Sequence, residues 1–349
     1  MKLLFVVVLI TLFPTEGLLS QTQQTLPQPL DSLVTTGINL ILLQEYSAAR
    51  QHFSLVATEY PDSPAGFLFH AAVLQTQAMD FREFHEKDQF DSLLVATRSL
   101  AEVMIESEPS SPWGHYYLGT ALGMDSYEKI QRGEYVSGYF KGRSAVSSIE
   151  KILELDSTFY DAYSILGTYY YWKSRKTEFL NWLPFFRDER AKGIECLRTA
   201  IEKGRYQRFA AMSNLIWIYL DALNYEEAEK LAREGLRSYP GQRAFLHGLA
   251  GALMGQRKFS EALQAYESQL HAILADSAPN TYNEIGCRLN IVWMKRELKD
   301  TTSVREHLSV IVSKHREQFP SSLRQKLDEK FDYALRFQQE LANGTFPGQ

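Results

Sequence analysis

The stretch that decides the fold is Phe209–Pro240, which reads FAAMSNLIWIYLDALNYEEAEKLAREGLRSYP. Apolar residues recur at helical spacing through its first half, and small residues recur at Ala228 and Ala232 in its second half. A polar turn at Asn224 separates the halves, and Pro240 closes the second because proline cannot continue a helix. The stretch therefore predicts two helices packed as a hairpin.

The same pattern returns 34 residues later and also occurs near the start of the chain. In the later copy, Ala262 stands 34 residues after Ala228. In the early copy, Gly37 and Ala49 are the small residues, and Pro61 closes the unit. Such units cannot bury their apolar faces alone and stack into arrays. Three copies in register predict one helical solenoid instead of two separate domains.

This arrangement resembles the tetratricopeptide repeat (TPR) superfamily, specifically an exported bacterial TPR-repeat protein, and the resemblance covers about residues 30–320. The resemblance implies an all-α fold, a right-handed α-solenoid of six to seven TPR-like helix hairpins with a C-terminal capping helix. We expect the repeat array over residues 30–320 and the capping helix and tail over residues 321–349. Ile216 and Leu274 depart from the family pattern, which prefers a small residue and a proline there.

Small residues mark the points where the two helices of a hairpin should cross. In register, they are Gly119 and Gly167 in the first helices of repeats three and four, and Ala145 and Gly193 in the second helices. Small side chains let two helix axes approach to about 8–10 Å. We therefore expect close helix contact within these two hairpins.

Repeats two, three and four are each longer than the common unit by about a dozen residues. The extra residues fall between the two helices, over residues 78–91, 124–139 and 173–188. Turns of this kind point to one side of a solenoid, so the insertions would form one contiguous ledge suited to binding. The alternative is that they lengthen the helices and pack on each other.

The N-terminus has the pattern of an export signal, which we assign to residues 1–17, followed by a linker over residues 18–29. The apolar run Leu3–Phe13 spans about 16 Å as a helix, roughly half of a bilayer core, so it suits export better than anchoring. Cleavage after Gly17 is preferred to cleavage after Ser20, and a buried first helix is the alternative. We expect a periplasmic or secreted protein with no membrane span after signal cleavage.

Composition and motifs argue against several functions. The balance of 37 Lys+Arg against 42 Asp+Glu gives a net charge of −5 with no basic block, so nucleic acid is not an expected partner. The 8 histidines lack metal-ligand spacing, and neither a nucleophile elbow nor a phosphate-binding loop occurs. We therefore expect no enzymatic activity, no metal and no cofactor. Cys196 and Cys287 fall in distant repeats, so we expect two buried thiols and no disulfide.

Aromatic residues make up 13% of the chain and are concentrated between Trp113 and Phe186. In the TPR family, positions 2, 5, 9, 12 and 13 of each first helix line a concave groove. The resemblance implies that this groove holds the following residues: Trp113, Tyr116, Asp161, Tyr171, Trp172, Trp217, Asp221 and His247. The carboxylate clamp of the family, a Lys and an Asn at positions 5 and 9, has no counterpart in repeats three to five. The same aromatic residues would also suit the core of the solenoid.

We therefore expect a non-enzymatic scaffold or adaptor that binds a peptide or protein partner in a concave aromatic groove. The alternative is an exported binding component for an apolar or aromatic small ligand. An open groove would favour a peptide or protein, and a groove closed over by Phe179–Phe186 would favour a small ligand.

Overall fold

The computed structural model describes residues 25–178, 187–276, 278–314, 319 and 321–348. Within these ranges the chain forms fifteen α-helices and no strand. In chain order they are α1 (Leu30–Leu42), α2 (Tyr46–Glu59), α3 (Pro64–Phe81), α4 (Lys87–Ser107), α5 (Pro112–Gln131), α6 (Tyr135–Leu155), α7 (Asp161–Lys176), α8 (Arg190–Lys203), α9 (Arg208–Asp221), α10 (Tyr225–Ser238), α11 (Arg243–Gly255), α12 (Phe259–Leu274), α13 (Thr281–Glu297), α14 (Val304–Ser313) and α15 (Ser321–Ala342).

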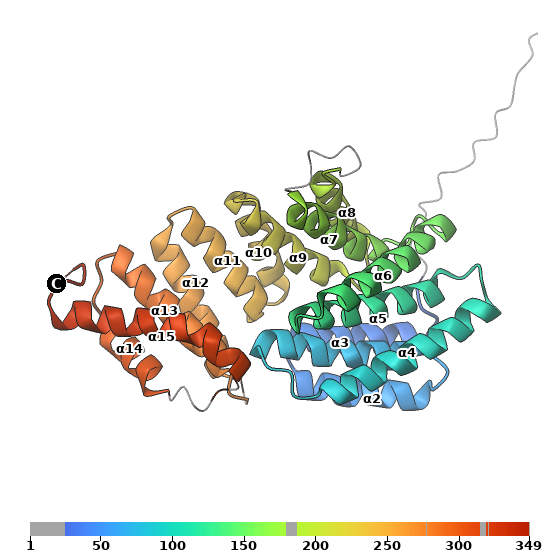
Figure 1. The fold of residues 1–349 in the computed structure, drawn as a ribbon, viewed down its shortest axis with the longest axis horizontal. Helices are drawn as coiled ribbons and strands as arrows, with labels where there is room; N and C mark the ends of the chain where they lie inside the picture. The colour runs from blue at the N-terminus through green and yellow to red at the C-terminus, as the bar shows by residue number, and fades with distance from the viewer. Residues whose placement is uncertain (1–24, 179–186, 277, 315–318, 320, 349) are drawn as a thin grey trace, which may run out of the picture.

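The helices pair into seven consecutive hairpins, from α1–α2 to α13–α14, and α15 follows the last hairpin. Each helix packs on its neighbours in the chain, and the row of hairpins bends into a curved superhelix (Figure 1). The turns inside the first, fifth and sixth hairpins each contain one residue with positive φ, at Gln44, Leu223 and Arg257. The expected all-α solenoid of six to seven TPR-like hairpins with a C-terminal capping helix is confirmed.

Small residues sit where helices cross, as the repeat register predicts. A Cβ atom on Gly167 would lie 2.7 Å from the carbonyl oxygen of Gly193, and a Cβ on Gly193 would lie 2.7 Å from that of Gly167. In the hairpin before, a Cβ on Gly119 would lie 2.6 Å from Cδ1 of Ile149. Gly167 and Gly193 are therefore required because the backbones of their two helices pack too closely for a side chain, whereas at Gly119 the nearest atom belongs to the Ile149 side chain.

The extra residues of repeats two and three lengthen the helices. α3, α4, α5 and α6 contain 18, 21, 20 and 21 residues, whereas α9 and α10 contain 14 each. Residues 82–86 and 132–134 are all that remain of the connecting turns. In repeats two and three the insertions therefore lengthen the helices and do not form a separate ledge. In the third insertion, α7 continues to Lys176, and residues 179–186 lie outside the described residues.

The superhelix closes on itself, because the first two hairpins contact repeats five to seven. Asp31 of α1 accepts a hydrogen bond from Arg205 Nε at 2.8 Å, across 174 residues of sequence. Gln44 Nε2 donates to the carbonyl oxygen of Gly241 at 3.1 Å. Asp80, at the end of α3, bonds to Arg243 of α11 and to Asn280, which directly precedes α13. We call these long-range contacts the closure.

Among the described residues, no helix combines the length and apolar character that a bilayer crossing requires. Cys287 is buried, as expected, whereas Cys196 is half-buried, and both are free thiols. Burial raises the pKa of the Cys287 thiol to about 12.

Candidate functional site

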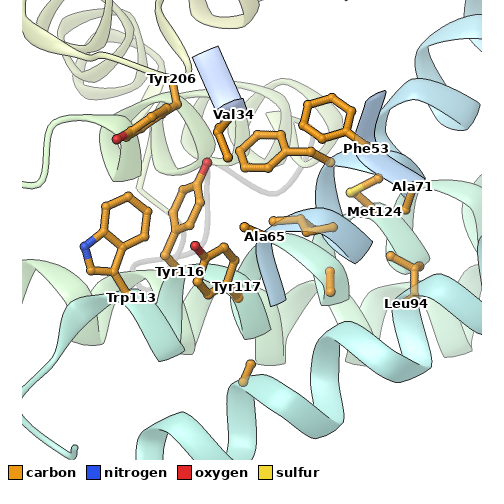
Figure 2. Packing of buried hydrophobic residues seen from close by; sticks show 14 of the residues in the cluster. Val34, Phe53, Ala65, Ala71, Leu94, Trp113, Tyr116, Tyr117, Met124 and Tyr206 are labelled. Atoms are coloured by element: carbon orange, nitrogen blue, oxygen red, sulfur yellow. The ribbon is translucent and has the colours of Figure 1, made fainter. Parts of the chain in front are cut away.

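Trp113 and Tyr116, two of the expected groove residues, belong to the core. Trp113 is 7% exposed and Tyr116 fully buried. The Trp113 ring centroid lies 4.9 Å from that of Phe159 and 5.7 Å from that of Tyr206. Gln207 Nε2 donates a hydrogen bond to the Tyr116 hydroxyl at 2.9 Å. Figure 2 shows Tyr206 reaching over Trp113 and Tyr116 from the α8–α9 turn. Trp113 and Tyr116 are therefore core residues and do not line a groove, because the curvature of the superhelix brings the α8–α9 turn onto them.

Asp161 is also fully buried and acts within the fold. It is the first residue of α7, and its Oδ1 atom accepts hydrogen bonds from the backbone N–H groups of Tyr206 and Gln207 at 2.9 and 2.7 Å. These N–H groups immediately precede α9, where backbone donors have no helical partner. Asp161 therefore fixes the turn that carries Tyr206, and it is not accessible to a partner.

Tyr171, Trp172 and Asp221 come together between α7 and α9. The buried Tyr171 hydroxyl donates to Asp221 Oδ2 at 2.8 Å, and Arg175 Nε donates to the same oxygen at 2.8 Å. Burial raises the pKa of Tyr171 to about 12, and the bond to Asp221 adds to this effect. Burial opposes ionisation of Asp221, but the bonds from Tyr171 and Arg175 outweigh it and lower the pKa of the carboxyl. The half-buried Trp172 ring packs edge-on against Tyr171, with centroids 5.3 Å apart.

Trp217 and His247 form an accessible aromatic pair, which we call the inner pair. Trp217 lies on α9 and is 38% exposed, the only one of the eight expected groove residues with an exposed side chain. Its ring lies 5.3 Å from the half-buried imidazole of His247 on α11, with a tilt of 34°. Burial lowers the pKa of His247, and the positive charge of Arg82 lowers it further. The imidazole is therefore neutral at physiological pH and presents an apolar face.

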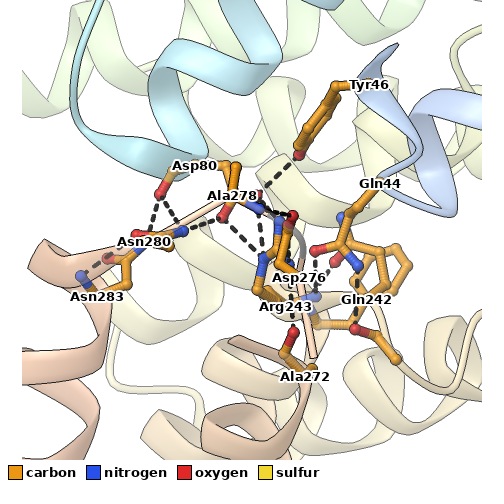
Figure 3. Close-up of polar contacts among 12 residues, drawn as sticks. Gln44, Tyr46, Asp80, Gln242, Arg243, Ala272, Asp276, Ala278, Asn280 and Asn283 are labelled. Carbon is orange, nitrogen blue, oxygen red and sulfur yellow. Dashed lines mark hydrogen bonds and ion pairs between the residues drawn. The ribbon is translucent and has the colours of Figure 1, made fainter. Parts of the chain in front are cut away.

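A buried polar cluster holds the closure together (Figure 3). Arg243 of α11 is 5% exposed and lies between two carboxylates. Its Nε atom donates to Asp80 Oδ2 at 3.0 Å, and its Nη1 atom donates to Asp276 Oδ2 at 2.9 Å. The Tyr46 hydroxyl donates to the same Asp80 oxygen at 2.9 Å, and Asn280 Nδ2 donates to the backbone carbonyl of Asp80 at 3.3 Å.

The cluster shows which side of α11 faces inward. Arg243 meets Asp80 across the superhelix, and His247 follows Arg243 by one helical turn. The two residues therefore share one side of α11. The inner pair lies on the side that faces the closure. Sequence reasoning missed the cluster because Arg243 and Asp80 are 163 residues apart and neither belongs to a motif.

A second surface that sequence reasoning missed lies at the start of α6. Tyr135, Val136, Tyr139 and Phe140 are 69%, 73%, 61% and 64% exposed. The Tyr139 and Phe140 rings touch each other at 5.7 Å between centroids. Their spacing of one and four residues places them on one side of the helix, a signal that was readable in the sequence. We call these four residues the α6 tip.

Two open hollows occur elsewhere, and neither contains any of the eight expected groove residues. One of about 360 Å³ lies among α8, α9 and α10, and one of about 530 Å³ among α4, α5 and α6. Both are lined largely by charged side chains, including Arg198 and Glu227 in the first and Glu102 and Lys151 in the second. In the described part of the chain, no group of three His, Cys, Asp or Glu residues is placed to hold a metal ion.

No protein-family model and no curated protein matches the sequence. Among solved structures, the fold is similar to PilW, described as a widely conserved type IV pilus biogenesis factor. The identity is 11%, the match covers 74% of this chain and 98% of that one, and the TM-score is 0.48. A match to the TPR domain of P58(IPK) has 13% identity, covers 88% of this chain and 90% of that one, and has a TM-score of 0.20. At these values neither likeness assigns a function to this chain.

Proposed function

We propose that this protein is a non-enzymatic interaction scaffold that holds a segment of a partner protein against the inner side of repeats four to six. The inner pair carries the proposal. Trp217 keeps 38% of its surface exposed although a close-packed core lies beside it, and His247 extends its ring surface. Tryptophan combines a large apolar face with one hydrogen-bond donor, and such residues dominate binding energy at protein interfaces.

The surroundings of Trp217 also suit a protein partner. Asp221 follows it by one turn and, with Arg175, provides a polar rim beside the aromatic surface. The α6 tip offers a second apolar contact area for a partner. The two hollows described above do not favour the small-ligand alternative, because both are lined largely by charged side chains and exclude the inner pair. Phe179–Phe186, which would have to close the groove, lies outside the described residues.

A matched pair of tryptophan variants tests the proposal. Trp293 on α13 is 42% exposed and lies 6.2 Å from the Tyr333 ring, so it matches Trp217 in exposure and in having an aromatic neighbour. We expect W217A to reduce capture of the native partner at least tenfold, and W293A to leave capture unchanged. Melting curves of both variants should match that of the parent protein. Equal capture by W217A and W293A would overturn the proposal.

We also propose that the protein is exported, with residues 1–17 as the signal peptide and residues 18–29 as the linker. Mass spectrometry on protein recovered outside the cytoplasm should find an N-terminus at Leu18 or Gln21. Recovery of the intact Met1 terminus from the soluble cytoplasm would refute export.

A further inference from the structure

Next to the closure, two cations have no acidic partner among the described residues. Arg82 directly follows α3, two residues after Asp80, and Lys330 lies in the middle of α15. Neither makes an ion pair or a hydrogen bond within the described chain, and the contact that Lys330 does make is with the face of the Tyr282 ring, 5.6 Å from its centroid. Lys330 is half-buried, so its charge is only partly hydrated.

The contacts of the closure bring these two cations to the same turn of α13. The carbonyl oxygen of Asp80 accepts hydrogen bonds from Asn280 and Asn283, which docks the end of α3 on the start of α13. Lys330 lies over Tyr282, and its Nζ atom is 3.2 Å from where a Cβ on Gly286 would be. Residues 282, 283 and 286 lie within about one helical turn, so the end of α3 and the Lys330 ammonium group converge there.

His247 joins the two cations from the α11 side. It lies one turn from Arg243, which itself binds Asp80. Burial and then Arg82 lower the pKa of His247, and burial and then Arg82 also lower the pKa of Lys330. The positive charge of Lys330 also lowers the pKa of His247. Among the described residues, Glu329 is the carboxylate whose charge raises the pKa of Lys330, and this effect is smaller than that of Arg82. Because Arg82 directly follows the docked end of α3 and Lys330 lies at the same turn of α13, their two positive charges are close enough to repel each other, with little compensation from the described residues, and the neutral His247 imidazole lies beside them.

We propose that Arg82 and Lys330, with His247 beside them, bind acidic side chains of the partner segment whose apolar side chains rest on Trp217. This rests on the proposed function and adds the chemical class of the partner. A carboxylate between Arg82 and Lys330 relieves their repulsion, and a guanidinium group binds it through two parallel hydrogen bonds. Gly286 leaves room for the Lys330 ammonium group. The two cations of this site come from the α3–α4 turn and from α15, whereas the carboxylate clamp of the TPR family uses positions 5 and 9 of the first helices.

Two peptides of equal length serve as probes, one alternating Leu and Glu and the other alternating Leu and Gln. Each carries an uncharged fluorophore and is titrated with the full chain while anisotropy is recorded. We expect the Glu peptide to bind at least tenfold more tightly than the Gln peptide. The difference should shrink as salt rises from about 0.05 to 0.5 M, because screening weakens charge pairing. Equal binding of the two peptides would overturn the proposal.

Two double variants locate the effect. R82Q/K330Q removes both cations of the site, whereas K326Q/R336Q removes two exposed cations of α15 and changes the net charge equally. We expect R82Q/K330Q to abolish the preference for Glu and K326Q/R336Q to keep it, with unchanged circular dichroism in both. An equal loss of the preference for the Glu peptide in both double variants would mean that net charge alone attracts the peptide, and it would refute the site. If W217A abolishes partner capture while the peptides bind equally, the acidic site fails and the scaffold proposal stands.

Discussion

Tyr116 and His247 occupy the same position, the fifth, in the first helices of repeats three and six, yet their environments differ. Tyr116 is fully buried under the α8–α9 turn, whereas His247 is half-buried beside an exposed tryptophan. The repeat position alone therefore does not decide whether a side chain can meet a partner. The difference arises from the closure, which covers the inner side of repeat three and leaves that of repeats five and six accessible.

The largest loss of stability should come from a substitution on the covered inner side of repeat three. We expect W113A to lower the free energy of unfolding by about 3–5 kcal/mol, because it removes a large ring packed against Phe159 and Tyr206 and leaves a cavity. W217A should cost about 1 kcal/mol or less, since that ring is 38% exposed. Urea denaturation of both variants measures the contrast. Similar losses of unfolding free energy in the two variants would show that the two regions do not differ in packing.

Breaking the closure should make the inner side of repeat three as accessible as that of repeats five and six. We expect R243A to cost about 3 kcal/mol, since it leaves the Asp80 and Asp276 carboxylates without their main cation. R233A is the control, because Arg233 pairs with Glu229 and Glu261 on the exposed surface, where an ion pair contributes about 1 kcal/mol or less. Small-angle scattering should show a larger radius of gyration for R243A only. An unchanged radius would mean that the closure does not set the curvature.

The hairpin of repeat four, which links the two regions, should tolerate little change. G167A should cost about 2 kcal/mol, because its new methyl group would lie 2.7 Å from the carbonyl oxygen of Gly193. G123A provides the control, since the nearest atom to its new methyl group is Ala145 Cβ at 3.9 Å. In a helix interior that exchange should stabilise by up to about 1 kcal/mol. Thermal melting distinguishes the two outcomes, and a stable G167A would argue against tight packing there.

The smallest effect concerns the polar rim of the accessible region. The pKa of Asp221 is lower in the folded protein than its ordinary 3.8, so its stabilising contribution is complete above that pH. The contribution is lost as pH falls through the lower folded value. D221N should therefore destabilise by less than about 1 kcal/mol at neutral pH and by nothing at strongly acidic pH. A destabilisation that is independent of pH would assign the role of Asp221 to packing instead of charge.

The architecture was readable from the sequence because its determinants are local. Gly167 and Gly193 mark a helix crossing that depends on residues of one hairpin, and the 34-residue period repeats that geometry. The candidate site was readable only in part. Trp217 and His247 lie on adjacent first helices, so the register found them, whereas Arg243 meets Asp80 through the accumulated rotation of several repeats. Small rotations per repeat leave no trace in a periodic pattern.

The contacts of Gln44 with Gly241 and of Asp80 with Asn280 have a consequence for how such a molecule evolves. Open solenoids grow and shrink by gain or loss of whole repeats, because each unit touches only its neighbours. Here an extra hairpin between repeats two and six would carry Asp80 away from Arg243, and a missing one would make the early and late repeats collide. The structure thus behaves as a ring whose number of units is fixed, and variation is confined to the lengths of individual helices and turns.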